Sequence, residues 1–416
     1  MFSPGSRSYI GAIVAAQMLA QIGAFALPAL LPAYMLRWHL SATDAGWLVG
    51  VFFAAYVAAV PLLLAMTDRL AVRRIYLLGT GLTTLSHLGF AFLADGFWPG
   101  LAFRVLAGVG WAGTYMTGLK ALADHLEGTA QSRAVSWHAA GVGISGAGSF
   151  AIAGLMASLA GPEAAFVLAA ITAACAFGIA ALIMPDKPTV DRPRSGALLD
   201  YRPVFRNRAA MAWIAGYTVH TWEMAAVRAW GVTFFATVIA WHGSPRWLPD
   251  PTVLFTLAGL AGVLVSVTGN ETAQRWGRKQ VVLLAMTIAA GLSLIAGWTA
   301  ALSASLAVIV LVLWNAAIYL DSSALTAGTV QAADPKLRGA TMGLHSMCGY
   351  AGGFIGPPLA GVVLDLVGRD SVAGWGIAFG HLAVITLTGL AVLQWLGRTS
   401  ASAAPVRGSA ELKARG

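Results

Sequence analysis

One apolar stretch of the chain, residues 216–230 (GYTVHTWEMAAVRAW), carries three ionisable side chains. His220 and Glu223 are three residues apart, so they share a face if the stretch is helical. Arg228 follows five residues after Glu223, about 140° further round a helix, and therefore need not pair with it. A carboxyl group and an imidazole can exchange protons, and a guanidinium can bind a carboxylate. We therefore predict that this stretch takes part in proton coupling and substrate binding.

Two more charged residues, Arg104 and Asp321, also lie in apolar sequence. An ionisable group within a membrane is a candidate functional residue, because it must face water or a partner. Arg104 could neutralise an anionic substrate or pack between helices. Arg228 could pair with Asp321 or with a substrate, and Glu223 and Asp321 could instead serve in a structural ion pair.

Asn315 and Tyr319 are spaced i and i+4 and could form hydrogen bonds with a substrate. The two cysteines, Cys175 and Cys348, fall in apolar stretches and provide no disulfide or metal framework. The sequence contains no Gly-x-x-x-x-Gly-Lys-Ser/Thr loop for ATP. No cofactor is expected, and an ion gradient is the energy source that remains for any coupled process.

The elements that must position these residues are membrane-spanning helices. Of the residues, 58% are hydrophobic and 10% are charged, whereas soluble domains carry about 25% charged residues. Apolar runs of about twenty residues recur along the chain, which predicts an all-α membrane protein in contact with the lipid bilayer. The twelve predicted spans are 9–35, 44–66, 75–94, 98–120, 134–160, 164–184, 209–239, 252–268, 280–298, 305–328, 339–367 and 375–396.

Lysine and arginine residues predict the orientation of these spans. With the N-terminus in the cytoplasm, 20 of the 26 basic residues fall in cytoplasmic segments, three in outer loops and three within spans. This bias predicts a multi-pass protein of the plasma (inner) membrane with both termini cytoplasmic, and it explains the net charge of +9 without a nucleic-acid partner. The predicted parts are a six-helix bundle (1–184), a cytoplasmic linker (185–208), a second six-helix bundle (209–396) and a disordered cytoplasmic tail (397–416).

The two predicted bundles show signs of duplication. Asp68-Arg69, between the second and third spans, aligns with Gln274-Arg275, between the eighth and ninth, at an offset of 206 residues. A similar offset brings Arg133 onto Arg338. Several matches at nearly one offset indicate two related six-helix units.

At these residues the chain resembles the major facilitator superfamily over its whole length. The family's loop reads Gly-x-x-x-Asp-Arg-x-Gly-Arg-Arg, and Asp68, Arg69 and Arg73 stand in register with it. The second copy keeps Arg275 and Arg278 but has Gln274 in place of the acid. Two further stretches, RVLAGVGWAG (104–113) and GFIGPPLAG (353–361), are similar to family motifs of the fourth and eleventh helices.

The resemblance implies a pseudo-symmetric two-bundle fold in which the first, fourth, seventh and tenth spans line a central cavity. It implies a conformational latch at the loop motifs that favours the outward-open state. It also places the fifth and eleventh spans at the interface between the halves, where Gly352, Gly356 and Pro357 would allow close contact and bending.

From these observations we expect a secondary active transporter, monomeric and not an enzyme, that couples protons to the movement of a small organic solute, with an organic anion favoured. Proton-driven efflux of amphipathic compounds is the alternative within transport. A membrane sensor that binds a ligand without moving it is the alternative outside transport.

Overall fold

The computed structural model describes residues 3–67, 69–186, 201–335 and 337–402, and its regular elements in these ranges are helices. Asp68, residues 187–200 of the predicted linker and residues 403–416 of the predicted tail lie outside the described residues. The helices are α1 (Arg7–Gln21), α2 (Ala26–Arg37), α3 (Ala42–Met66), α4 (Val72–Leu93), α5 (Phe97–Ala123), α6 (Gly128–Ala160), α7 (Pro162–Ile183), α8 (Arg202–Arg206), α9 (Arg208–His242), α10 (Pro251–Trp276), α11 (Arg278–Ala296), the 3₁₀ turn η1 (Trp298–Ala301), α12 (Ala304–Ala332), α13 (Arg338–Val367) and α14 (Val372–Ser402).

Each of the twelve predicted spans coincides with one of the long helices, except that the first is divided into α1 and α2. Proline inside a helix clashes with the carbonyl group four residues earlier. Pro28 avoids this clash because α2 begins only two residues before it, at Ala26. Eleven of the described helical segments are long and apolar enough to cross a membrane. The exception is α5, which is 27 residues long but carries Arg104, Lys120 and several glycines.

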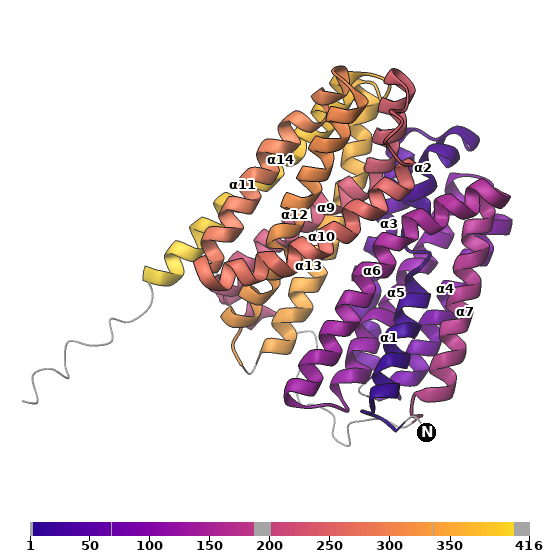
Figure 1. Cartoon of the computed structure of the whole chain (residues 1–416). Coiled ribbons are helices and arrows are strands. Elements are labelled where there is room, and N and C mark those ends of the chain that lie inside the picture. The colour runs from indigo at the N-terminus through magenta and orange to yellow at the C-terminus, as the bar shows by residue number, and fades with distance from the viewer. Residues whose placement is uncertain (1–2, 68, 187–200, 336, 403–416) are drawn as a thin grey trace, which may run out of the picture.

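The helices form two bundles, α1–α7 and α9–α14, that stand side by side (Figure 1). We call the end of the bundles at which α1 begins the near end, and the opposite end the far end. The two bundles meet through α3 against α13, α6 against α10 and α2 against α9. These pairs therefore form the interface between the halves, with the predicted fifth and eleventh spans, α6 and α13, among them.

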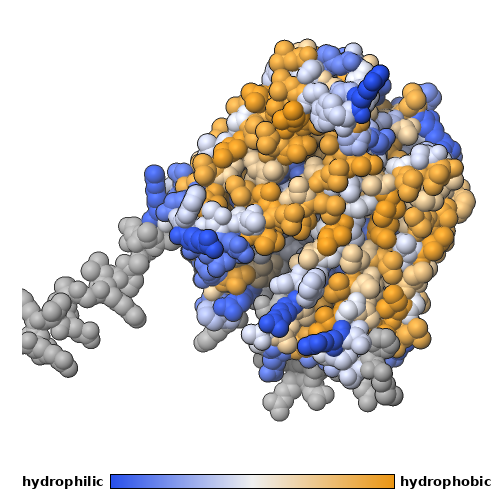
Figure 2. All heavy atoms as spheres, viewed as in Figure 1, coloured by the Kyte–Doolittle hydropathy of each residue, from blue (hydrophilic) through white to orange (hydrophobic). Residues whose placement is uncertain are grey.

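The outer surface of the molecule matches a lipid environment. Figure 2 shows apolar side chains covering the flanks of both bundles, with hydrophilic side chains gathered towards the ends. Large apolar residues such as Leu85, Leu182 and Leu264 are exposed on helices that face outward. A bilayer satisfies such a surface, whereas water would not.

At the far end, α13 holds the first residues of α3. One oxygen of the Asp365 carboxylate accepts a hydrogen bond from the backbone N–H of Ala42 (2.8 Å), and the other accepts from the N–H (2.7 Å) and hydroxyl (2.6 Å) of Thr43. Arg369 donates to the carbonyl of Leu40 (3.2 Å). A negative charge at a helix N-terminus is favourable because it satisfies free N–H groups and the helix dipole. These contacts therefore join the two bundles at the far end.

The last helix extends further than the sequence predicts. The predicted second bundle ends at residue 396, but α14 continues to Ser402. Proline first appears at Pro405, so no proline interrupts the helix between these positions. Within the predicted linker, residues 202–206 form the short helix α8.

If Asp365 helps to close the far end, its replacement by alanine should favour states in which that end is open. Spin labels at Asp95 and Ser244, in a protein with both cysteines replaced, report the distance between the far ends of the bundles. Asp365→Ala should enlarge the population with the longer distance roughly fivefold, since partly exposed charged hydrogen bonds contribute about 1 kcal/mol. Glu271→Ala is the control, because that side chain is exposed on α10 and takes no part in these contacts. An unchanged distance distribution in Asp365→Ala would contradict this role.

Candidate functional site

A cavity with a volume of about 90 Å³ lies between the two bundles. Its walls combine aromatic rings, glycines and few polar groups. They are formed by Gln21, Phe25, Phe53, Trp111, Val142, Gly143 and Gly146 from the first bundle and Tyr217, Thr221, Met224, Ala225, Arg228, Tyr350 and Gly353 from the second. The expected contributions of the first, fourth and seventh spans are present, as α1, α5 and α9. The tenth span, α12, contributes no residue to these walls, whereas α3, α6 and α13 do.

Arg228 is the only Asp, Glu, Lys, Arg or His among the residues that line the cavity. Its guanidinium donates a hydrogen bond to the hydroxyl of Tyr319. The guanidinium carbon lies 5.1 Å from the ring centre of Phe25 and 5.6 Å from that of Tyr319. Among the described residues, no carboxylate lies within 4.0 Å of Arg228. The side chain is thus held by rings and a hydroxyl, and its charge is not balanced by an acid.

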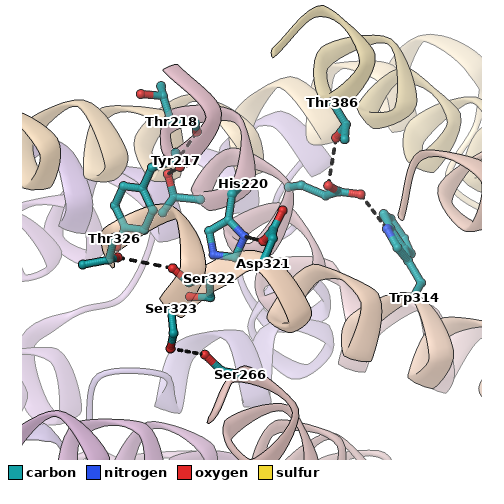
Figure 3. A network of polar contacts seen from close by, with 12 residues as sticks. Tyr217, Thr218, His220, Ser266, Trp314, Asp321, Ser322, Ser323, Thr326 and Thr386 are labelled. Atoms are coloured by element: carbon teal, nitrogen blue, oxygen red, sulfur yellow. Dashed lines mark hydrogen bonds and ion pairs between the residues drawn. The ribbon is translucent and has the colours of Figure 1, made fainter. Parts of the chain in front are cut away.

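A second polar group lies inside the second bundle, between α9 and α12. Nδ1 of His220 and Oδ1 of Asp321 are 2.8 Å apart, and both side chains are almost fully buried (Figure 3). The predicted pairing of Arg228 with Asp321 is absent, since Asp321 faces His220 instead. An imidazole and a carboxylate at this distance can share a proton.

Glu223 lies close to this pair but has its own partners. Its two oxygens accept hydrogen bonds from Nε1 of Trp314 (2.6 Å) and from the hydroxyl of Thr386 (2.8 Å), which join α9 to α12 and α14 (Figure 3). The side chain is 2% exposed and does not line the cavity. An indole N–H can only donate, whereas a hydroxyl can donate or accept. The site can therefore hold Glu223 ionised, or protonated with its proton directed to Thr386.

Tyr217 connects the cavity with the His220–Asp321 pair. It lines the cavity, and its ring centre lies 5.7 Å from that of His220 and 3.8 Å from that of His345. His345 in turn contacts the hydroxyls of Thr329 (3.1 Å) and Thr326 (3.3 Å). The buried pair therefore lies one side chain behind the cavity wall at Tyr217.

Two predicted site residues lie away from the cavity. Arg104 is buried between α5 and α3, where it donates to the carbonyl of Leu48 (3.2 Å) and lies 4.7 Å from the ring centre of Phe52. Asn315 donates to the carbonyl of Ala258 (3.0 Å) and so joins α12 to α10. Both make packing contacts here, which agrees with the packing alternative for Arg104. Tyr319 does not line the cavity, but its hydroxyl accepts a hydrogen bond from Arg228, which does.

Among the described residues, no hydrogen bond or ion pair joins the expected latch residues across the bundles. Arg69, Gln274 and Arg275 are exposed. Arg73 donates to the carbonyl of Ala181 (2.6 Å), within its own bundle. Arg278 has two buried guanidinium nitrogens without a hydrogen-bond partner among the described residues.

Nearby, the hydrogen bond from Arg74 (3.0 Å) holds the pKa of Asp186 below its ordinary value. This contact fastens the start of α4 to the segment after α7 in the first bundle.

The expected hinge residues lie in two different contacts. A side chain at Gly352 or Gly356 would collide with the carbonyl oxygens of Thr218 and Trp222, so both glycines let α13 approach α9 in the same bundle. Pro357 lies against Gly46 of α3, in the other bundle. Its carbonyl also accepts a hydrogen bond from Trp230 (3.0 Å).

Sequence reasoning missed several residues that shape the site. The aromatic residues Phe53, Tyr217 and Tyr350 line the cavity, but aromatic residues at helical spacing carry no sign of which face they occupy. Thr386 is one of several threonines in an outer span, and nothing nearby in the sequence marks it as a partner of Glu223.

A comparison with protein families matches this chain to the Major Facilitator Superfamily over residues 13–357 and 236–415. Human monocarboxylate transporter 11 is 27% identical over 79% of this chain and 70% of its own length. The MFS-type transporter YceJ of Bacillus subtilis (strain 168) is 21% identical over 90% of this chain and 93% of its own length.

Solved structures with a similar fold include a bacterial homologue of the human lysosomal transporter Spinster, in an inward-facing and occupied conformation. It has a TM-score of 0.77 and 17% identity, and the match covers 95% of this chain and 98% of that one. The nucleoside transporter NupG has a TM-score of 0.72 and 14% identity, with 93% and 98% covered. These likenesses concern the fold.

Replacing Thr386 by valine removes one of the two donors to buried Glu223 and should lower the thermal unfolding midpoint in detergent. The loss of a hydrogen bond to a buried charged group costs about 1.5–3 kcal/mol. Thr388→Val is the matched control, because this exposed threonine bonds only to the carbonyl of Val384 in its own helix. Equal midpoints for the two variants would show that the Thr386–Glu223 contact does not stabilise the bundle.

Proposed function

The chain belongs to the major facilitator superfamily, and on that premise we propose that it is a proton-coupled secondary transporter of a small organic anion. It is a multi-pass membrane transporter of a small solute and not an enzyme. Our proposal adds the anion, the proton and the orientation: an inner-membrane protein with both termini in the cytoplasm, acting as a monomer. The excess of basic residues in the predicted cytoplasmic segments supports this orientation.

The observation that carries the proposal is the unbalanced positive charge of Arg228 on the cavity wall. A charge in a partly desolvated site is costly unless a counter-charge approaches it. Because no described carboxylate lies within ion-pair distance, a substrate carboxylate is the natural counter-charge, and a guanidinium can bind it with two hydrogen bonds. The name of the human relative, a monocarboxylate transporter, agrees with this chemistry.

The proton would be carried inside the second bundle, by Glu223 and by the His220–Asp321 pair. These three groups are titratable, buried and close enough to influence one another electrostatically. The His220–Asp321 pair lies next to Tyr217, so it could exchange a proton with the cavity without placing an acid beside the bound anion. Proton and anion would then bind to the same bundle at separate points.

Alternating access supplies the movement. With the far end joined by Asp365 and its partners, the solute would enter and leave from the near end in this state. In the opposite state these contacts would part, and the latch residues Arg69, Arg73, Arg275 and Arg278, with Asp68 and Gln274, would close the near end. Gly352, Gly356 and Pro357 would let α13 adjust between its two neighbours.

Efflux of amphipathic compounds is the second candidate, favoured by the aromatic rings in the cavity. The direction of coupling separates the two functions. In proteoliposomes, a proton symporter accumulates its solute when the outside is acidic. A proton antiporter that exports the solute responds to the gradient in the opposite sense.

We expect Arg228→Gln to lower the uptake of a panel of radiolabelled monocarboxylates into proteoliposomes about 100-fold at low concentration, since a paired guanidinium–carboxylate contact contributes about 3 kcal/mol. Arg228→Lys should keep part of the activity, because it keeps the charge but loses the paired geometry. Arg246→Gln, in an exposed loop, is the control. Normal uptake by Arg228→Gln would rule out this residue as the anion site.

We expect Glu223→Gln and Asp321→Asn to abolish accumulation driven by a pH gradient, while exchange of labelled for unlabelled solute across the membrane continues. Proton release is needed for net uptake but not for exchange. Glu271→Gln, on the exposed face of α10, should behave as the unaltered protein. Gradient-driven accumulation that persists in both variants would place the coupling group elsewhere.

A further inference from the structure

We propose that the cavity selects a planar aromatic monocarboxylate, a molecule with one carboxylate and one ring. This inference rests on the proposed function, because it assigns a substrate class to the same anion site. It follows from three features of the cavity: the number of charges, the freedom of Arg228 and the arrangement of the rings.

The number of charges limits the substrate to one anionic group. Within the described part of the chain, Arg228 is the only Asp, Glu, Lys, Arg or His that lines the cavity, and the remaining polar side chains in the walls are uncharged. A second carboxylate on the ligand would be transferred from water to a largely apolar wall that offers no counter-charge, and this transfer is strongly unfavourable. Dicarboxylates and phosphorylated compounds are therefore disfavoured.

The guanidinium of Arg228 is already fixed but is not fully engaged. Tyr319 accepts one of its N–H groups, and the rings of Phe25 and Tyr319 lie close to it. An arginine has five N–H donors, so several remain for a ligand. A side chain that is ordered beforehand loses less entropy when the carboxylate binds. One end of the substrate is thereby assigned to α9, on the second bundle.

The rings across the cavity form a compact aromatic wall of Phe53, Trp111 and Tyr350. Phe53 and Tyr350 are stacked with ring centres 5.9 Å apart, and Trp111 meets Tyr350 edge to face at 5.2 Å. Tyr56 supports the wall from behind, 4.9 Å from Trp111 and 4.4 Å from Tyr350. Such a supported wall presents ring faces and edges in fixed positions, which suits another ring better than a flexible chain.

Glycines complete the cavity beside this wall. Gly143 and Gly146 of α6 and Gly353 of α13 line it, and the side chains of Val263, Phe25 and Phe53 pack close to these glycines. The cavity volume of about 90 Å³ restricts the ligand to a compact molecule. The wall carries residues of both bundles, since Phe53 and Trp111 belong to the first and Tyr350 to the second. A ring bound there would contact both halves while its carboxylate engages Arg228.

The test is a set of four probes bound to the purified full-length protein and measured by isothermal titration calorimetry. Benzoate carries both features, cyclohexanecarboxylate lacks the aromatic ring, benzyl alcohol lacks the charge, and phthalate has a second carboxylate. Benzoate should bind roughly fivefold tighter than cyclohexanecarboxylate and at least tenfold tighter than phthalate and benzyl alcohol. Absence of benzoate binding, or equal binding of benzoate and cyclohexanecarboxylate, overturns the inference.

Two variants separate this inference from the proposed function. Arg228→Gln should remove the binding of both monocarboxylates, whereas Trp111→Leu should bring the ratio of benzoate to cyclohexanecarboxylate affinity close to one. Trp137→Leu, at a tryptophan that is 67% exposed on α6, is the matched control and should leave the ratio unchanged.

If the ratio is already one in the unaltered protein while Arg228→Gln abolishes binding, the aromatic class fails and the anion site stands. If benzoate binds equally well to Arg228→Gln, the anion site fails as well. The unaltered protein with its four probes decides the aromatic class even if Trp111→Leu does not fold.

Discussion

One electrostatic constraint underlies the proposed transport: a positive charge on the wall of a mostly apolar cavity must be balanced. Arg228 is held by the hydroxyl of Tyr319 and by two aromatic rings, and these contacts position the guanidinium without neutralising it. The buried acids nearby in the chain do not supply the balance, because Asp321 faces His220 and Glu223 accepts from Trp314 and Thr386. In the proposed function, an anion from outside the chain supplies this balance and leaves again when it is released.

The second bundle divides its ionisable groups between two places. Arg228 lines the cavity, and the His220–Asp321 pair lies behind the wall at Tyr217. This separation matters because an acid beside Arg228 would compete with the substrate for the same charge. It also makes α9 the central element of the mechanism, since Tyr217, His220, Glu223 and Arg228 all belong to it. The same helix packs against α12, α13 and α14, so a change of charge on α9 can reach the interface between the bundles through α13.

The sequence predicts most of the fold because the physical signal for a membrane helix is local. A run of apolar residues is long enough to identify each span, and the prediction failed mainly at edges, as where α14 continues to Ser402. The sequence also predicts a functional role for residues 216–230, because charged side chains within a membrane are costly and are candidates for functional sites. It could not place them, since Glu223 and Asp321 turn into the bundle and Arg104 packs against Phe52 and Leu48. Partners such as Thr386 and Asp365 lie more than 150 residues from the groups that they bind, and only the fold brings them together.

The most direct test of the account is an experimental structure of the protein with 4-bromobenzoate, in which anomalous scattering locates the bromine atom. The carboxylate should lie within hydrogen-bond distance of the Arg228 guanidinium, with the bromine beside Phe53, Trp111 and Tyr350. A ligand bound in this cavity with its carboxylate away from Arg228, or a cavity that stays empty at saturating ligand, would contradict the claim that Arg228 awaits an anion.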